Sequence, residues 1–392
     1  MLRKLLFWLA LPVMVSCPRL VVPAVKAAAA VAYFPAAGNA WQNQTPAAAG
    51  FDGARLAEAV AFAKTQVTTQ MTPNFSPQEE IFGKLLGPMP TSRAATNGLV
   101  LRHGPIVAER ADTERADTER VDPTYSVAKS LLSILLGITL NRGLIRNIHD
   151  PVAQYVHDGG YDSLHNCLIT WEHYARQISG WEGDRWGENA DFISPEAFGK
   201  GERKPCTLQV PGIYFEYNDV RINRFALWLL RLWQKSLPVV FKQEVMDPIG
   251  ASNSWQWMAY SNAVPTVNGQ ALPSVSGGTR WGGGLRISAR DEACFGYLLL
   301  RQGRWDGRQI VSSAWVRQAT TRGPIGLGYG YLRRLNTEKK VWPDAPATSY
   351  AALGAGSNSI WVDPEHDQVI VWRWYNGSPN ELIKRVLGAL KS

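Results

Sequence analysis

One stretch, residues 124–132, constrains the fold of this chain more than any other. Its polar start ends in Ser126, Lys129 follows three residues later, and an apolar helical run continues from there. Positions i and i+3 share one face of a helix, so we expect the Lys129 ammonium beside the Ser126 hydroxyl. A serine becomes a nucleophile when a neighbour takes its proton, and a lysine can do so if burial lowers its pKa towards neutrality. The spacing therefore predicts a nucleophilic serine at a helix start; the alternative is an ordinary helix start with a solvated lysine.

The remaining patterns predict strands and helices at both ends of the chain and helices between them. Helical spacing of apolar residues begins after Asp52, and a His-Gly-Pro turn at 103–105 joins two strands. Helical patterns also fill much of 165–275. This order indicates an α/β core with an inserted helical subdomain. We expect helices over 51–67, 126–141, 222–235, 289–302 and 380–390, and strands over 98–110, 325–334, 359–362 and 368–374.

The N-terminal residues 1–35 differ from the globular remainder. Arg3 and Lys4 precede an apolar run over 5–15, which is typical of an export signal and short for a membrane-spanning helix. Signal cleavage near 27–32, a lipoprotein-type ending at Cys17 and an uncleaved membrane anchor all stay open. The segment predicts an exported protein, either periplasmic or anchored to the bacterial envelope membrane. Residues 36–50 are expected to be a linker to a domain over 51–392, with its helical subdomain at about 130–275.

The composition indicates which kinds of partner, metal or cofactor this chain is not expected to bind. The net charge of +8 is spread along the chain without a basic block, so we expect no nucleic-acid partner. The six histidines are dispersed and no Cys-x-x-Cys occurs, so we expect no metal and no cofactor. A Cys167–Cys206 disulfide is conceivable in an oxidising compartment, and the sequence settles neither this pairing nor the oligomeric state.

A second candidate group surrounds Tyr217. This tyrosine follows a Pro-Gly turn at 211–212 and directly precedes a helical pattern, so its phenol could project into a cleft. A neighbouring cation favours the ionised form of a phenol, which could then accept a serine proton or later protonate a leaving group. The alternative is a buried tyrosine with a satisfied hydroxyl.

Together, five segments in order resemble the serine β-lactamase-like superfamily, above all its class C-type branch of esterases, D-aminopeptidases and 6-aminohexanoate-dimer hydrolases. The Ser-x-x-Lys pattern is itself typical of penicillin-recognising serine enzymes. The resemblance implies a β-lactamase/transpeptidase-like fold, with an antiparallel sheet flanked by helices and an inserted, mainly helical subdomain. The segments cover most of 95–390 and lie at 125–130, 177–181, 211–219, 282–291 and 361–367.

The resemblance also implies roles for single residues. Ser126 would be the acylated nucleophile, Lys129 its proton acceptor and electrostatic partner, and Tyr217 the general acid/base of a Tyr-x-Asn motif. The third position of that motif is Asp219 in this chain. An ionised aspartate cannot donate to a substrate carbonyl as an asparagine amide does, so Asp219 is expected to bind substrate differently.

Relatives place a Lys-Thr-Gly or His-x-Gly triad on a cleft-lining strand, which corresponds to 352–357 here. This stretch has no cationic residue to pair with a substrate carboxylate. Neutral esters or amides are therefore favoured over β-lactams and D-Ala-D-Ala peptides. The implied oxyanion hole uses the N–H groups of Ser126 and about Ala355. The substrate-binding candidates on this stretch are Gly354, Ala355 and Gly356.

Two aromatic residues, Tyr174 and Trp181, flank the turn at 178–180, which borders the cleft in relatives. They are candidate substrate contacts or plain packing residues.

The sequence thus predicts a serine hydrolase that cleaves a small-molecule ester or amide through an acyl-enzyme. One alternative, a penicillin-binding D-Ala peptidase or a β-lactamase, requires recognition of a carboxylate. The other is a non-catalytic binding or sensor module on the same fold. The intact set of Ser126, Lys129 and Tyr217 argues against the last reading.

Overall fold

The structure is a computed structural model that describes residues 33–38, 40–67, 86–110, 117–185, 188–189, 209–278, 283–326 and 328–391. Residues Ala32–Ser392 form one compact unit. The expected export signal or anchor over 1–35 lies almost entirely outside the described residues, as does Cys206. Within the described part, every helix is too short or too polar to cross a membrane.

A six-stranded antiparallel sheet forms the centre of the unit, with the strand order β12-β13-β14-β15-β1-β2. It confirms the strands predicted at 98–110, 359–362 and 368–374. The bounds are β1 Asn97–Arg102, β2 Ile106–Arg110, β12 Arg334–Leu335, β13 Tyr350–Gly354, β14 Asn358–Asp363 and β15 Gln368–Arg373.

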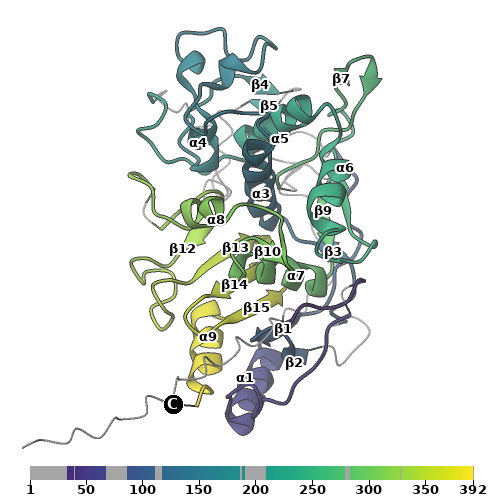
Figure 1. Cartoon of the computed structure of the whole chain (residues 1–392), viewed down its shortest axis with the longest axis vertical. Helices are drawn as coiled ribbons and strands as arrows, with labels where there is room; N and C mark the ends of the chain where they lie inside the picture. Colours follow the sequence, from purple (N-terminus) through teal and green to yellow (C-terminus); the bar gives the residue numbers. More distant parts are fainter. Residues whose placement is uncertain are drawn as a thin grey trace, which may run out of the picture. The chain divides into compact units, whose positions relative to one another are not determined.

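Side chains of β15 alternate between two apolar cores, as the two-residue period of a strand requires. Val369 and Val371 join the larger core, and Ile370 and Trp372 join the smaller one on the opposite face. The larger core is shared with helix α7 (Ala289–Leu300), and the smaller one with α1 (Gly53–Thr65) and α9 (Pro379–Gly388), which lie side by side (Figure 1). Both faces of the sheet are therefore covered by helices.

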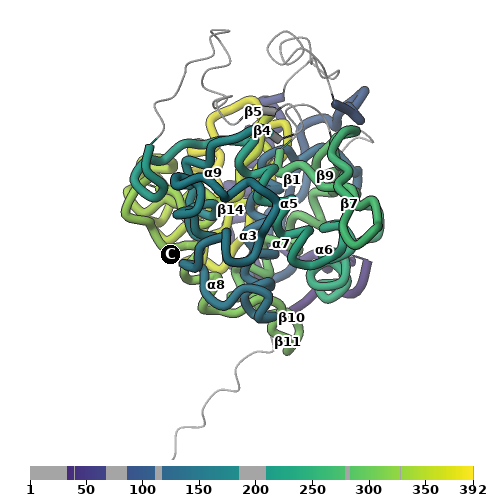
Figure 2. Tube along the Cα trace, turned by 90° about the horizontal axis from the view of Figure 1, so that it is seen from above, coloured from purple at the N-terminus to yellow at the C-terminus, as the bar shows by residue number. Residues whose placement is uncertain are grey.

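The helix α3 (Val127–Asn141) is buried along nearly its whole length. It packs against α5 (Asp219–Trp233) and against β13 and β14, and lies in the interior of the unit when seen from above (Figure 2). The predicted helices are confirmed, with α5 beginning three residues before the expected start at 222. The shorter helical elements are α4 Trp171–Ala175, α6 Leu237–Phe241, α8 Ser313–Ala319, the π-helix Lys242–Met246, and 3₁₀ turns at Val152–Gln154, Asn166–Leu168 and Ala355–Ser357.

A small second sheet brings the residues before Ser126 against the segment that leads into α7. Its strand order is β3-β9-β6, with β3 at Asp122–Pro123, β9 at Gly284–Ile287 and β6 at Gln256–Met258. Three two-stranded pairs complete the described strands: β4 Asp184–Arg185 with β5 Glu188–Asn189, β7 Thr266–Val267 with β8 Gln270–Ala271, and β10 Arg304–Trp305 with β11 Arg308–Gln309.

One expectation about a strand is wrong. Residues 325–334 were expected to form a strand, but among the residues described in this range only Arg334 belongs to one. Gly326, Gly328 and Leu332 adopt positive φ angles, which turn the chain instead of extending it. The described residues of the expected linker over 36–50 form no helix or strand. They pack onto the unit, because Trp41 is buried and the Gly38 N–H donates to the Gly250 carbonyl.

Candidate active site

The predicted pair of Ser126 and Lys129 comes together at the start of α3. Ser126 occupies the N-cap position and is half-buried, and Lys129 lies one turn further into the helix. The Lys129 Nζ donates to the Ser126 Oγ over 2.7 Å. Only 1% of Lys129 is exposed, so this ammonium is shielded from solvent. The neighbouring hydroxyl and amine expected from the i, i+3 spacing are therefore present.

The charge state expected for Lys129 is corrected by a third residue. Burial lowers the pKa of Lys129, but the electrostatic interactions and hydrogen bonds with Asp219 and Tyr217 outweigh burial, so the pKa is raised. The Asp219 Oδ1 lies 2.6 Å from the Lys129 Nζ. The sequence allowed a lysine pKa lowered by burial, and it did not reveal the ion pair that opposes this effect. Lys129 is thus an ammonium group that donates to Ser126.

Tyr217 contacts the same ammonium. The Lys129 Nζ is 4.7 Å from the centre of the Tyr217 ring and hydrogen-bonds its hydroxyl. Tyr217 is half-buried and precedes α5 by two residues; the intervening Asn218 caps that helix by accepting from the Arg221 N–H. The start of α3 and the start of α5 therefore supply all four polar groups of the site.

Gln177 holds the Tyr217 segment in place, a role that sequence reasoning missed. Its carbonyl accepts from the Glu216 N–H over 2.9 Å, and its side-chain oxygen accepts from the Asn218 N–H over 2.7 Å. Its amide nitrogen donates to the Tyr329 hydroxyl over 2.9 Å, and the Tyr329 ring meets Tyr217 edge to face. The only sequence signal was its place in the segment 177–181 that resembles the family.

The end of β13 touches the backbone of the nucleophile. A Cβ atom on Gly354 would lie 2.2 Å from the Thr124 carbonyl oxygen and 3.2 Å from the Ser126 nitrogen. A glycine is required there because the backbone at the end of β13 comes so close to the backbone just before Ser126 that a side chain would not fit. Ala355 and Gly356 follow in an exposed 3₁₀ turn. Gly354 therefore lies against the backbone of the nucleophile, and the two exposed residues follow directly after it.

The two aromatic candidates lie in the core instead. Tyr174 has no exposed surface; it stacks on Phe225 and accepts a hydrogen bond from the Tyr161 hydroxyl over 3.2 Å. Trp181 is 2% exposed and donates its indole N–H to the Gly160 carbonyl. Both are packing residues in this structure. A buried aromatic and a cleft aromatic give the same sequence signal, so the pattern could not separate them.

Across the described ranges, no three histidine, cysteine or acidic residues are placed to hold a metal ion. The chemistry available is that of a hydroxyl, an ammonium, a carboxylate and a phenol.

The covered antiparallel sheet, with a serine–lysine pair at the start of a buried helix, defines a β-lactamase/transpeptidase-like protein. The family model described as Beta-lactamase matches residues 94–383, more than half of the chain. The chain belongs to this beta-lactamase family, which confirms the resemblance found in the sequence.

Solved structures share the fold at low sequence identity. EstCE1, a hydrolase with promiscuous acyltransferase activity, is 18% identical with a TM-score of 0.54, over 86% of this chain and 99% of its own. The octameric penicillin-binding protein homologue from Pyrococcus abyssi is 17% identical with a TM-score of 0.55, over 86% and 77%. A putative 6-aminohexanoate-dimer hydrolase from Bacillus anthracis is 18% identical with a TM-score of 0.50, over 75% and 77%. Among curated proteins, none matches.

Proposed function

We propose that this protein is a serine hydrolase that cleaves a neutral ester or amide through an acyl-enzyme on Ser126. The observation that carries the proposal is the 2.7 Å contact between the Lys129 ammonium and the Ser126 hydroxyl, with Tyr217 on the same ammonium. A nucleophile and its activating groups within hydrogen-bond reach are the geometric requirement for covalent catalysis.

In this proposal Tyr217 moves the proton, because Lys129 already carries one. The Ser126 Oγ attacks the substrate carbonyl carbon, and its proton passes to the oxygen of Tyr217, which this step requires in its phenolate form. The tetrahedral intermediate then collapses, and Tyr217 returns the proton to the leaving alcohol or amine. A water molecule then attacks the acyl-enzyme and gives its proton to Tyr217. Tyr217 returns the proton to the Ser126 oxygen as the acid leaves. The Lys129 ammonium stays charged throughout and stabilises the negative charge that passes between the two oxygens.

The oxyanion hole of this proposal consists of the N–H groups of Ser126 and Ala355. The close approach of Gly354 to the Ser126 nitrogen supports it, because the next N–H along the chain is that of Ala355. Two N–H groups aimed at one oxygen stabilise the tetrahedral intermediate.

Charge favours a neutral substrate. The stretch 352–357 has no cationic residue to pair with a carboxylate, and the Lys129 ammonium is already paired with Asp219. A β-lactam or a D-Ala-D-Ala peptide would bring such a carboxylate into the site. Fold neighbours that are named as hydrolases fit the ester or amide class.

Export is part of the proposal, since residues 3–15 have the layout of a signal. Fractionation of a bacterial host expressing the full chain would place the protein in the periplasm or the envelope membrane. Recovery in the cytosol alone would contradict export.

The experiment is a turnover panel with wild type and Ser126→Ala. It compares p-nitrophenyl esters, the matching anilides and nitrocefin. We expect ester or anilide turnover by wild type and none by Ser126→Ala. Turnover of nitrocefin that is faster than turnover of the esters and anilides would favour a β-lactamase. No turnover of any substrate would favour a non-catalytic binding module.

A further inference from the structure

The nucleophile follows a strained residue. Tyr125 has φ 51°, in the left-handed region that costs a non-glycine residue about 1–2 kcal/mol. Such a conformation persists only when the surroundings fix it. The contacts of the residues just before Ser126 must therefore hold the turn that aims its hydroxyl.

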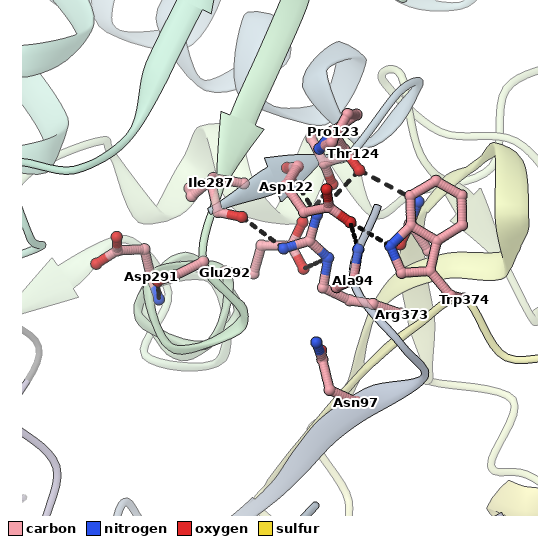
Figure 3. Close-up of polar contacts among 12 residues, drawn as sticks. Ala94, Asn97, Asp122, Pro123, Thr124, Ile287, Asp291, Glu292, Arg373 and Trp374 are labelled. Atoms are coloured by element: carbon pink, nitrogen blue, oxygen red, sulfur yellow. Dashed lines mark hydrogen bonds and ion pairs between the residues drawn. The ribbon is translucent and has the colours of Figure 1, made fainter. Parts of the chain in front are cut away.

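A buried arginine holds the strand that leads into this turn (Figure 3). Arg373 ends β15 and, by alternation, lies on the same face as Val371, towards α7. It is completely buried, and its guanidinium donates to the carbonyls of Asp122 over 2.7 Å and Pro123 over 2.9 Å. A third hydrogen bond, to the Ile287 carbonyl over 2.5 Å, ties the same group to β9.

The carboxylate of Glu292 holds the next residue, Thr124. Glu292 lies in the first turn of α7 and is 1% exposed. Its Oε1 accepts a hydrogen bond from the Thr124 hydroxyl, and its Oε2 lies 4.0 Å from the Arg373 Nε (Figure 3). The Thr124 N–H donates to the Leu285 carbonyl over 3.0 Å. Thr124 is thus fixed through both its side chain and its backbone.

Asp122 and Trp374 hold the other side of the turn. The Asp122 Oδ2 accepts from the Ala94 N–H over 2.8 Å and from the Trp374 indole N–H. The Trp374 ring in turn meets the Tyr125 ring edge to face, with 5.8 Å between the ring centres. Each of the residues 122–125 is therefore fixed by at least one contact with another segment.

We propose that Glu292, Arg373 and Thr124 form a positioning device that aims the Ser126 hydroxyl, in addition to stabilising the fold. None of the three is placed to touch substrate. The inference rests on the proposed function, because it concerns the reactivity of Ser126. A buried ion pair alone is weak evidence for any role. What favours positioning is that both charged side chains hydrogen-bond residues 122–124, just ahead of the nucleophile, while one further bond of Arg373 reaches Ile287.

The test removes one hydroxyl. Thr124→Val deletes the hydrogen bond to Glu292, and Thr124→Ser keeps it. Thr139→Val is the matched control. Thr139 is fully buried, as Thr124 is, and its hydroxyl accepts from the Trp233 indole over 2.8 Å. It lies in α3, about 20 Å along the helix from Ser126. For each variant, the second-order rate of phosphonylation of Ser126 by a fluorophosphonate is measured together with Tm.

We expect Thr124→Val to slow phosphonylation by about tenfold to a hundredfold, as small misplacements of a reacting group do. Thr124→Ser should keep most of the rate, and Thr139→Val should lose Tm without losing rate. If Thr124→Val does not fold, Thr124→Ala removes the same hydroxyl without placing a methyl group against the carboxylate, and is compared with Thr124→Ser. A wild-type rate in the Val or Ala variant, or an equal slowing in Thr139→Val, overturns the positioning role alone. Absence of labelling in wild type overturns the proposed function and this inference with it.

Discussion

The Lys129 Nζ lies 2.6 Å from the Asp219 Oδ1, and both side chains are almost fully buried. The pKa of Lys129 is raised, and the Lys129 Nζ donates to the Ser126 Oγ over 2.7 Å. A group whose pKa is higher in the folded state stabilises the fold below its unfolded pKa. The contribution of Lys129 is therefore complete below about pH 10.5 and is lost as the pH rises through the raised value.

The Asp219→Asn variant is expected to have a lower Lys129 pKa than wild type. The substitution removes a negative charge that raises this pKa, whereas the burial that lowers it remains. The measurement is the pH dependence of the Lys129 13Cε chemical shift, assigned with Lys129→Arg. The control is Asp247→Asn, which removes an exposed ion pair with Lys242 and should leave the titration unchanged. An unchanged titration in Asp219→Asn would show that the ion pair does not set the charge of Lys129.

The Gly354→Ala variant is expected to lose the reactivity of Ser126. The new methyl group would lie 2.2 Å from the Thr124 carbonyl oxygen, and neither backbone can move without disturbing the nucleophile. The control is Gly388→Ala at the end of α9, where a Cβ meets no atom within 4 Å. That variant should be neutral, or up to about 1 kcal/mol more stable. Phosphonylation and urea unfolding of both variants check this, and a reactive Gly354→Ala would contradict the close approach.

The Tyr217→Phe variant is expected to lower kcat by about 10²- to 10⁴-fold, the contribution of a positioned proton-transfer group. The control is Tyr214→Phe, because Tyr214 is 53% exposed and lies three residues earlier. Steady-state kinetics on the best ester of the panel measure both variants. Equal activity of the two would remove Tyr217 from the proton route.

The Tyr174→Phe variant is expected to be less stable by about 0.5–1.5 kcal/mol, because it loses the buried hydrogen bond with Tyr161. Its kcat and KM should match those of wild type, since Tyr174 lies in the core. Urea unfolding and steady-state kinetics test the two parts. A raised KM at unchanged stability would instead indicate that Tyr174 contacts the substrate.

The parts of the site that the sequence predicted are those set by local geometry or implied by the family resemblance. Ser126 and Lys129 meet because three residues of helix separate them, and the strand alternation of β15 follows from its apolar run. The resemblance implied that Tyr217 acts with Lys129, and the two are in contact. Other long-range contacts could not be predicted, because nothing local encodes them. The raised pKa of Lys129 depends on Asp219 in another helix, and the support of Thr124 depends on Glu292 from the far part of the chain.

The most direct test of the central claim is intact-mass analysis after incubation with a fluorophosphonate, on wild type and on Ser126→Ala. The account predicts one phosphonyl adduct on wild type, mapped to the peptide containing Ser126, and no adduct on the variant. An unmodified wild type, or an equal adduct on both proteins, would contradict a nucleophilic Ser126.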